Sequence, residues 1–500
     1  MKHQEISSFR LVNELSFNSF PDVKKTFYQE KNEFRFLNQS YRFEKEINWN
    51  NIENGKLWLY NLTYFDFLNQ PELTAESAEE LIISFIQYKN TVQEKIIADD
   101  PYPTSLRGIN LIKCIVNHGI KNDRIDHFLH TEYNRLFNNL EYHLLGNHLL
   151  ENGLSLLFGG YYLHNTDLIN KGVEIVQEQL DEQILNDGMH FELSDMYHVI
   201  LLDRLLDVCN LLISNEDYFL LKSGFLLSLQ TYVKKMLGAL EQITFDNGDL
   251  AFINDAIKGL TKPRDVICEY ASQMQLYPEK ISLSDSGYRK YKMLNYESLI
   301  DVGSIGPIYI PGHGHSDHFN FLVYYKGQPL IVDTGTSSYE NDDYRYYERS
   351  TKAHNTVEVG GENQSDVWSV FRVGKRALVK VNEEKENQIS AELTSSIKHK
   401  YNHKRTFTCL PESMIIQDQV DVKEQLSKAY FHFPSTVSLM KENDLKIKVE
   451  TDIVLTFEGA TECMIEKCFI ADGYGKRVEA QKVCAVFTES LNSTFTFGHN

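Results

Sequence analysis

One short stretch of the chain concentrates side chains that could bind a metal ion or transfer protons. Within residues 313–354 these are His313, His315, Asp317, His318, Asp333 and His354. In PGHGHSDH, His313 and His315 point to the same side if the backbone is extended, because side chains in a strand repeat every two residues. Asp333 ends the strand-like run PLIVD and His354 precedes NTVEV, so neighbouring strands could bring these groups together. Three such ligands with room for a water match a divalent-metal site, best fitted by zinc, and a hydrogen-bonded histidine cluster is the alternative.

A second polar group lies in the segment GNHLLENG, in a helical context. Residues four apart share one face of a helix, so His148 and Asn152 can point the same way, as can Asn147 and Glu151. Buried amides and imidazoles need hydrogen-bond partners. Hydrogen bonding between helices is therefore the alternative to a binding role.

A third segment, DGMHFELSDMYH, places Tyr197 after a turn and at the start of a helical pattern. A phenol can donate or accept a proton, so Tyr197 could take part in acid–base chemistry. An aromatic residue in a helix is normally part of the core, and this segment alone is weak evidence for a site.

Two hydrophobic patterns indicate which elements hold these segments. From about residue 75 to 275 apolar residues recur at helical spacing, as in HVILLDRLLDVCNLLIS. Past about residue 290 the chain has short alternating runs such as SMIIQDQV and LKIKVETDIVLTF, which are typical of antiparallel strands. We therefore predict a helical domain with an N-terminal extension over residues 1–285 and an antiparallel β-sandwich over residues 286–500. Clefts are common between domains, so we expect the active site where the two halves meet.

The composition is that of a globular protein and excludes several classes of partner. The chain has 500 residues, 42% of them hydrophobic, which is enough for two or three domains. It contains no run of roughly 18 apolar residues, so we expect no membrane-spanning helix. A net charge of −20 argues against nucleic acids and anionic membranes as partners, since both need a basic surface. Seven scattered cysteines form no disulfide framework, and we expect reduced thiols.

The first thirty residues mix charges into every short apolar stretch and offer no small-residue cleavage site. A secretory signal has the opposite pattern. We therefore expect a cytoplasmic protein, or a periplasmic bacterial protein if a signal has been removed. The sequence does not indicate an oligomeric state.

Two arginines are candidates for binding an anionic ligand. Residues 341–380 hold seven Lys or Arg against six Asp or Glu, so this window, which contains Arg349, is locally neutral to basic in an acidic chain. Arg107, in PYPTSLRG, could clamp a carboxylate or a sulfate through its bidentate guanidinium group. Ordinary solvated charges are the alternative at both positions.

Taken together, these segments resemble the heparinase II/III-like family. The family's β-domain signature is similar to DVGSIGPIYIPGHGHSDHFNF, PLIVDTGTSSY and RYYERSTKAHNTVEV. Its helical motifs are similar to LWLYNLTYFDFL, PYPTSLRGINLIK, EYHLLGNHLLENG and DGMHFELSDMYH. The likeness runs from about residue 45 to 380 in ordered blocks, and the shared order is more specific than any single block.

The resemblance implies an α/α toroid, an incomplete helical barrel, followed by an antiparallel β-sandwich. It also implies a polysaccharide lyase that acts on an acidic, uronate-containing glycan, either glycosaminoglycan-like or a bacterial exopolysaccharide. By motif, Asn147 and His148 match the positions that meet the substrate carboxylate. Tyr197 matches the catalytic tyrosine and His313 the catalytic histidine.

The resemblance further implies a zinc site at His315, Asp333 and His354, which is structural in part of the family. The chain departs from the family at residues 189–191, where Met, His and Phe stand in place of a frequent aromatic pair. The alignment of the catalytic tyrosine therefore rests on Tyr197 and the histidine after it.

The residue types suit β-elimination on chemical grounds as well. The C5 proton of a uronate is poorly acidic while the adjacent carboxylate is ionised, so an enzyme must first neutralise that carboxylate or hydrogen-bond to it. Asn147 and His148 are suited to that contact. A base must then take the C5 proton and an acid must protonate the leaving oxygen, which Tyr197 and His313 can do in either assignment.

Two other functions remain open from the sequence. An α/α toroid can also carry a glycoside hydrolase with paired carboxylates, for which Glu151, Glu192 and Asp195 are candidates. The chain could instead be a non-catalytic glycan-binding factor in polysaccharide biosynthesis. A lyase product carries a C4–C5 double bond that absorbs ultraviolet light, and a hydrolase product does not.

Overall fold

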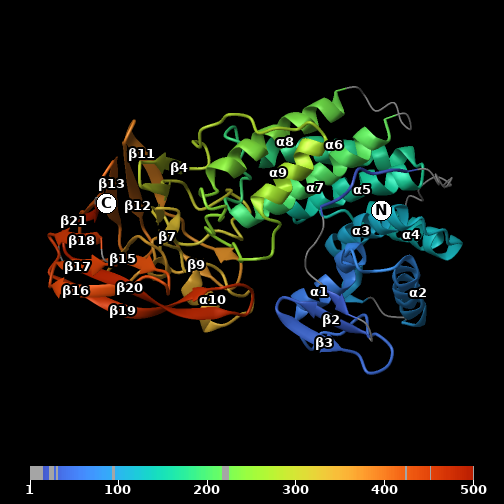
Figure 1. Ribbon diagram of the computed structural model, residues 1–500, viewed down its shortest axis with the longest axis horizontal. Coiled ribbons are helices and arrows are strands. Elements are labelled where there is room, and N and C mark those ends of the chain that lie inside the picture. Colours follow the sequence, from blue (N-terminus) through green and yellow to red (C-terminus); the bar gives the residue numbers. More distant parts are fainter. Residues whose placement is uncertain are drawn as a thin grey trace. The chain divides into compact units, whose positions relative to one another are not determined.

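The computed structural model describes residues 15–21, 27–29, 32–92, 96–216, 224–422, 425–450 and 452–498 (Figure 1). The first fourteen residues, which contribute to the prediction about a secretory signal, lie outside this set. The chain forms two compact units. The helical unit comprises Met1–Gln183, Leu201–Lys234 and Val266–Tyr277, and the β unit comprises Ile184–Ile200, Lys235–Asp265 and Pro278–Asn500.

Helices dominate the first part of the chain, as the 3.6-residue pattern predicts. They are α1 (Lys56–Tyr64), α2 (Ala75–Thr91), α3 (Pro101–His118), α4 (Asp123–Phe137), α5 (Gly146–Tyr162), α6 (Thr166–Gln183), α7 (Asp195–Ser214), α8 (Phe225–Gln242) and α9 (Arg264–Gln273). None of the helices in the described residues is long and apolar enough to cross a membrane. The predicted change from helices to strands falls between the end of α9 and the start of β4 at Tyr288, within the predicted transition.

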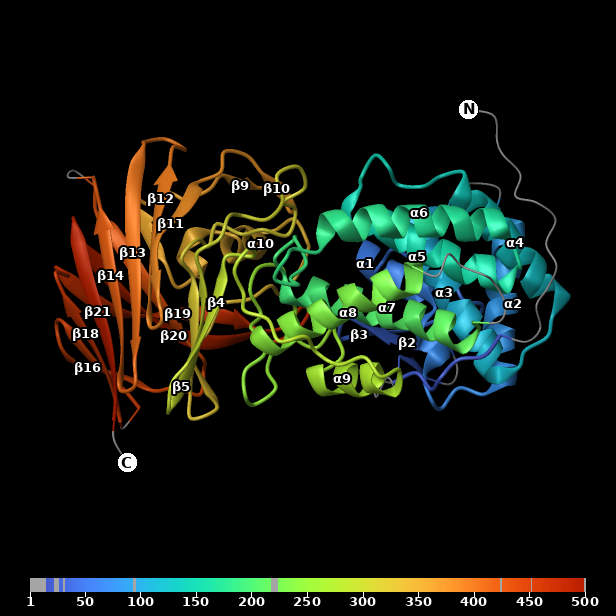
Figure 2. The same cartoon turned by 90° about the horizontal axis from the view of Figure 1, so that it is seen from above.

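Glycines let α5 and α6 pack closely against each other (Figure 2). A Cβ atom on Gly153 would lie 2.8 Å from the side chain of Ile175, and one on Gly172 would lie 3.0 Å from the carbonyl oxygen of Gly153. Helix α3 begins with Pro101 in its first turn and ends at Gly119, which has a φ of 65°. Both are common helix-boundary residues, and they place Tyr102 and Arg107 on this helix.

A small antiparallel sheet near the N-terminus was not predicted, because this part of the chain was expected to be helical. Its strands are β1 (Tyr28–Gln29), β2 (Glu33–Phe36) and β3 (Gln39–Arg42). In β2 the buried residues Phe34 and Phe36 alternate with exposed Arg35, the two-residue period of a half-buried strand. The ring of Phe36 packs edge-on against Trp58, with centroids 5.2 Å apart.

The β unit contains antiparallel sheets. The largest has the strand order β11-β12-β13-β14-β21-β18-β17-β16, and two smaller sheets have the orders β19-β20-β15-β8 and β4-β5-β6-β7. The strands are β4 (Tyr288–Lys292), β5 (Tyr296–Asp301), β6 (Phe321–Tyr325), β7 (Gln328–Ile331), β8 (Val357–Val359), β11 (Leu378–Lys385), β12 (Gln388–Ser395), β13 (Tyr401–Leu410), β14 (Ser413–Val420), β15 (Ser427–Phe433), β16 (Leu439–Asn443), β17 (Lys446–Val449), β18 (Ile453–Glu458), β19 (Glu462–Ala471), β20 (Arg477–Phe487) and β21 (Ser490–Phe497).

Alternating burial makes these sheets pack face to face. In β13 every second residue is buried, so one face of the strand is apolar. Phe431 of β15 contacts Phe495 of β21, with ring centroids 6.0 Å apart, and both belong to one continuous buried cluster. This is the core of a β-sandwich. The short helix α10 (Asp343–Glu348) and the two-stranded hairpin of β9 (Val367–Trp368) and β10 (Arg372–Val373) complete the unit.

Candidate active site

The carboxylate of Asp255 is the centre of a buried hydrogen-bond network in the β unit. It accepts hydrogen bonds from Nδ1 of His313 and from Nε2 of His315, each at 2.9 Å. Arg345 forms a bidentate ion pair with the same carboxylate, with its Nη2 2.8 Å from Oδ2. Burial alone would raise the pKa of Asp255, but Arg345 and the two histidines outweigh it and hold this pKa well below its usual value. Asp255 is therefore ionised at neutral pH.

Asp255 thereby sets the tautomer of His313. A carboxylate can only accept a hydrogen bond, so Nδ1 of His313 carries a proton, and Nε2 is the ring nitrogen that has the lone pair in the neutral form. The Nε2 atom lies 3.7 Å from Oε2 of Glu192. Sequence reasoning missed Asp255, because it lies in a loop far from the histidine motif and no local pattern marks it.

Tyr197 lies directly against His313. The two rings are stacked, with centroids 3.9 Å apart and an angle of 28° between their planes. The hydroxyl of Tyr197 donates a hydrogen bond to that of Tyr339 at 3.4 Å. The structure therefore brings together two of the four predicted catalytic residues, and it places a phenol beside an imidazole of fixed tautomer.

Arg349 is buried, whereas its predicted role in substrate binding requires a guanidinium group that a glycan can reach. It follows α10 and is 1% exposed. Its Nη1 donates to the carbonyl oxygens of Ser369 at 3.0 Å and Arg372 at 3.2 Å, and its Nη2 donates to that of Gly314 at 2.9 Å. The assignment of Arg349 to substrate binding is wrong in this respect, because its guanidinium group is buried and bound to the backbone.

The three predicted zinc ligands lie near one another in the interior of the β unit. Nδ1 of His354 is 2.8 Å from Oδ2 of Asp333, and the rings of His315 and His354 have centroids 5.3 Å apart. Nδ1 of His315 is buried and has no hydrogen-bond partner among the described residues. An orphaned imidazole nitrogen beside a carboxylate and a second imidazole has the donor chemistry that zinc takes. Within the described part of the chain, however, no group of three or more His, Cys, Asp or Glu residues has a geometry that could hold a metal ion.

The helical unit contains the other two predicted catalytic residues, in the first turn of α5. Nδ1 of His148 lies 3.1 Å from Oε1 of Glu141, and the ring of His148 contacts that of Tyr102 with centroids 4.6 Å apart. Asn152 donates to Oε2 of Glu141 at 3.0 Å and so fixes this carboxylate. The His148 side chain is 41% exposed. Asn147 is half-buried, and its side-chain amide makes no hydrogen bond to the residues that the structure describes.

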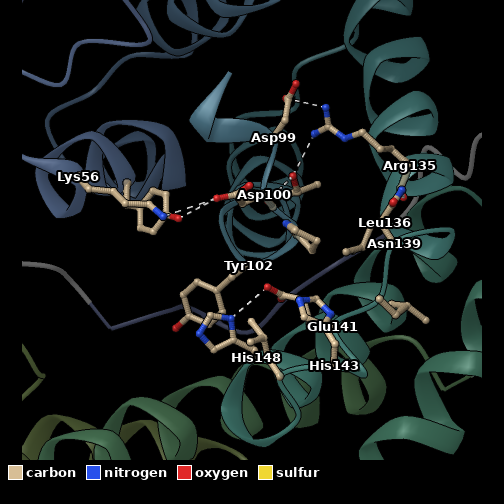
Figure 3. Close-up of a pocket in the computed structure, with 15 residues that line it drawn as sticks. Lys56, Asp99, Asp100, Tyr102, Arg135, Leu136, Asn139, Glu141, His143 and His148 are labelled. Carbon is tan, nitrogen blue, oxygen red and sulfur yellow. Dashed lines mark hydrogen bonds and ion pairs between the residues drawn. The ribbon is translucent and has the colours of Figure 1, made fainter. Parts of the chain in front are cut away.

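His148 faces a cavity of about 710 Å³ in the helical unit (Figure 3). The cavity is lined by tyrosine rings and by charged residues that pair with one another. Lys56 lies 3.8 Å from Asp100, and Arg135 contacts Asp99. Its size falls in the range of pockets that bind small molecules or parts of larger ligands.

Arg107, the second predicted substrate-binding residue, lies in the core of the helical unit and is 1% exposed. Its Nε donates to Glu132 at 3.1 Å, its Nη1 donates to the carbonyl oxygen of Ala98 at 3.0 Å, and its Nη2 donates to Thr104 at 3.1 Å. No face of the guanidinium group is left for a glycan. We therefore assign Arg107 a structural role and correct the prediction, which failed because burial cannot be read from a single motif.

Strained backbone marks both groups of residues. Leu145, directly before α5, has a φ of 59°, and Leu193, two residues before α7, has a φ of 57°. Asn254, next to Asp255, has a φ of 59°. Left-handed conformations are unfavourable for leucine and persist where surrounding contacts require them, which is frequent at functional sites.

The heparinase II/III N-terminus pattern matches residues 117–284, and the heparinase II/III-like C-terminal pattern matches residues 277–496. A heparin-sulfate lyase from Bacteroides stercoris is 20% identical over 260 residues, which cover 46% of this chain and 38% of that protein. A heparin-sulfate lyase from Pedobacter heparinus is 22% identical over 249 residues, covering 44% and 36%. The matched region thus spans less than two fifths of each of these relatives.

Solved structures with this fold include a heparinase III gene product, with a TM-score of 0.67 and 16% identity over 92% of this chain and 82% of that chain. A heparan sulfate lyase, HepC, from Pedobacter heparinus has a TM-score of 0.60 and 15% identity over 94% and 82%. These likenesses confirm the predicted fold class, a helical toroid followed by an antiparallel β-sandwich. The two family patterns overlap at residues 277–284 and together span residues 117–496, so the chain belongs to the heparinase II/III-like family.

Proposed function

We propose that this protein is a polysaccharide lyase that cleaves a uronate-containing acidic glycan by β-elimination. One observation carries the proposal above all others: the Tyr197 ring is stacked on His313, whose tautomer is set by the buried carboxylate of Asp255. A phenol and an imidazole side by side can serve as the acid and the base that the reaction needs. Family membership supports the same reading, and the names of the relatives point to a glycosaminoglycan of the heparan sulfate type as the substrate.

The reaction requires two proton transfers. The C5–H proton passes to a base, the electron pair forms the C4=C5 double bond, the C4–O bond breaks, and the leaving oxygen takes a proton from an acid. In the neutral form of His313, Nε2 has the lone pair that a base needs, since Nδ1 carries the proton that is donated to Asp255. A phenol keeps its proton at neutral pH unless its surroundings lower its pKa. We therefore assign His313 as the base and Tyr197 as the acid.

The charge that develops on the uronate carboxylate needs hydrogen-bond donors. Asn147 and His148 are our candidates. The Asn147 amide makes no hydrogen bond to described residues, and the His148 ring is exposed at the cavity and oriented by Glu141.

Zinc remains part of the proposal as a structural cofactor. His315, Asp333 and His354 would hold it, and the orphaned Nδ1 atom of His315 supports this set. A structural zinc ion contributes folding energy and takes no part in the proton transfers. We propose further that the protein works in the cytoplasm, or in the periplasm if a signal is removed from a precursor.

A hydrolase is the less favoured alternative, because one of its candidate carboxylates is already engaged. Oδ2 of Asp195 accepts a hydrogen bond from the backbone N–H of Phe252 at 2.6 Å, and Oδ1 accepts one from Met196 at 3.0 Å. Asp195 is 3% exposed, so its carboxylate stabilises the fold by accepting these backbone hydrogen bonds. A non-catalytic glycan-binding role would not need a histidine of fixed tautomer against a tyrosine.

Mass spectrometry of the products tests the proposal against both alternatives. Incubation with a size-defined heparan sulfate octasaccharide should give fragments whose masses sum to that of the substrate, because elimination adds no water. Fragments whose masses sum to substrate plus one water would establish a hydrolase. An unchanged octasaccharide, in a panel that also contains other uronate glycans, would favour the binding factor.

A further inference from the structure

One exposed aromatic side chain lies against His313, and a second lies three residues earlier in the chain. The Phe371 ring meets the His313 ring edge-on, with centroids 5.8 Å apart and an interplanar angle of 81°, yet Phe371 is 42% exposed. Trp368, three residues earlier, is 53% exposed. Neighbouring large aromatic residues left in water next to a polar site frequently mark a binding surface.

Both side chains belong to the tip of the β9–β10 hairpin. Trp368 ends β9, and Phe371 directly precedes β10. Between them, Ser369 has a φ of 54°, in the left-handed region that residues other than glycine rarely adopt. The tip is thus held in a conformation that needs support from outside the hairpin.

Two buried arginines supply that support through the carbonyl groups of the tip. Arg345 donates from Nε at 3.1 Å and from Nη2 at 2.8 Å to the carbonyl oxygen of Val370. Arg349 donates from Nη1 to the carbonyl oxygen of Ser369 at 3.0 Å. Arg345 is 0% exposed and Arg349 is 1% exposed, so these hydrogen bonds are shielded from water.

The same two arginines also hold the residues around His313. Arg345 pairs with Asp255, which orients His313, and Arg349 donates to the carbonyl oxygen of Gly314 at 2.9 Å. The hairpin tip and the segment that contains His313 are therefore held in place by the same two arginines. Support of this kind is expected where the aromatic residues of the tip must hold a ligand at a fixed position relative to His313.

We propose that Trp368 and Phe371 form a stacking subsite for a pyranose ring next to the sugar that reacts at His313. This inference rests on the proposed function and adds a subsite to it. Aromatic rings present a partly negative face, and the C–H face of a pyranose is apolar and partly positive, so the two stack without needing a charge on the sugar. The ligand is thus an oligosaccharide long enough to reach beyond the reacting unit.

Tryptophan fluorescence can test this subsite without depending on catalysis. The chain has three tryptophans, of which Trp49 and Trp58 are 0% exposed, so an aqueous quencher such as acrylamide reports chiefly on Trp368. The probe is a carboxyl-reduced heparan sulfate tetrasaccharide, which cannot undergo elimination because its C5 proton is no longer next to a carboxylate. We expect the tetrasaccharide to reduce quenching of the intact protein. Unchanged quenching at millimolar tetrasaccharide would overturn the inference.

Variants then locate the contact. By calorimetry, Trp368→Ala and Phe371→Ala should each weaken binding of the same tetrasaccharide about tenfold. Phe469→Ala is the matched control, since Phe469 is a 49% exposed aromatic residue of β19 in the same unit, and its affinity should equal that of the unchanged chain. Equal affinities in all three variants would refute the stacking subsite. Elimination is measured separately, from the ultraviolet absorbance of the products of unmodified glycan. A protein that binds the tetrasaccharide through these residues but gives no such products would refute the proposed lyase activity and leave the stacking subsite intact.

Discussion

The carboxylate of Asp255 accepts a hydrogen bond from Nδ1 of His313 at 2.9 Å, and the partners of that carboxylate keep it ionised. The contact leaves Nε2 of His313 as the proton-accepting atom. Asp255 is separated from His313 by 58 positions in the chain. It acts through His313 as a positioning residue, and its effect on the reaction can be separated from its effect on the fold.

Asp255→Asn should lower kcat by about 10²–10⁴-fold, because the imidazole loses the partner that fixes its tautomer. It should also destabilise the fold, since Arg345 is left buried without a carboxylate. Asp418→Asn is the matched control: it removes the partner of Arg405, another fully buried arginine of the β unit. Both variants should have lower melting temperatures, and only Asp255→Asn should lose turnover per folded molecule and change the pH profile of kcat. Equal losses of kcat in the two variants would assign Asp255 to the fold alone.

Tyr197→Phe keeps the ring that stacks on His313 and removes only the hydroxyl. Turnover of the natural glycan should fall by about 10²–10⁴-fold with folding and glycan affinity nearly unchanged, because the proton donor acts in the transition state. A uronate carrying a nitrophenolate leaving group at C4 needs no acid and should restore most of the rate to this variant. It should not rescue His313→Ala. If the rescue is reversed between the two variants, His313 is the acid and Tyr197 the base.

Much of the architecture follows from local hydrophobic periods. The apolar stripe of residues 198–214 and the alternating run of residues 413–420 became α7 and β14, because burial of one face decides the period in each case. His313 and His315 bond the same carboxylate, but they do so from a turn and not from the extended strand that the two-residue spacing assumed.

What the sequence could not indicate depends on contacts between distant segments. Arg107 and Arg349 have the charge of ligand-binding residues, and only the positions of Glu132 and of the β9–β10 hairpin show that both are structural. Asp255 lies in a loop with no periodic pattern, and Trp368 gave no sign of exposure. The early strands β1–β3 were missed because their apolar residues are few and closely spaced.

The zinc prediction can be checked by elemental analysis of protein purified without chelators, which should contain about one zinc per chain. Coordination at roughly 2.0–2.2 Å by His315, Asp333 and His354 would follow from a structural site. His354→Ala should then lower the melting temperature more than it lowers turnover. His399→Ala, at an exposed position of the same unit, is the control and should change neither. Protein that contains no metal and whose unfolding is insensitive to chelators would show that it has no structural zinc site.

The helical unit should lose stability in acid through Glu132. Burial raises the pKa of Glu132, but Arg107, Arg135 and Lys89 outweigh it and lower this pKa from 4.5 to about 2. A carboxyl group whose pKa is lowered in the folded state stabilises the fold at any pH above its pKa in the unfolded chain. This contribution fades as the pH falls from 4.5 toward 2. Glu132→Gln should cost about 3–5 kcal/mol at pH 7, because it leaves Arg107 buried without its partner.

Urea unfolding followed by circular dichroism measures this contribution. The difference in unfolding free energy between the unchanged chain and Glu132→Gln should shrink as the pH falls from 4.5 toward 2. Glu80→Gln, at an exposed position of α2, should behave like the unchanged chain at every pH. A difference that stays constant across this range would show that the charge of Glu132 does not stabilise the fold.

Ultraviolet absorbance of the reaction products is the most direct test of β-elimination. The purified chain is incubated with a panel of uronate glycans, heparan sulfate among them, beside Tyr197→Phe and the control Tyr277→Phe, whose exposed ring lies in the helical unit. We expect a steady rise in absorbance from C4=C5 double bonds with at least one glycan, an equal rise for Tyr277→Phe, and almost none for Tyr197→Phe. Glycan cleavage without any rise in absorbance would show that the protein does not act by β-elimination, and an equal rise for Tyr197→Phe would show that Tyr197 is not the acid.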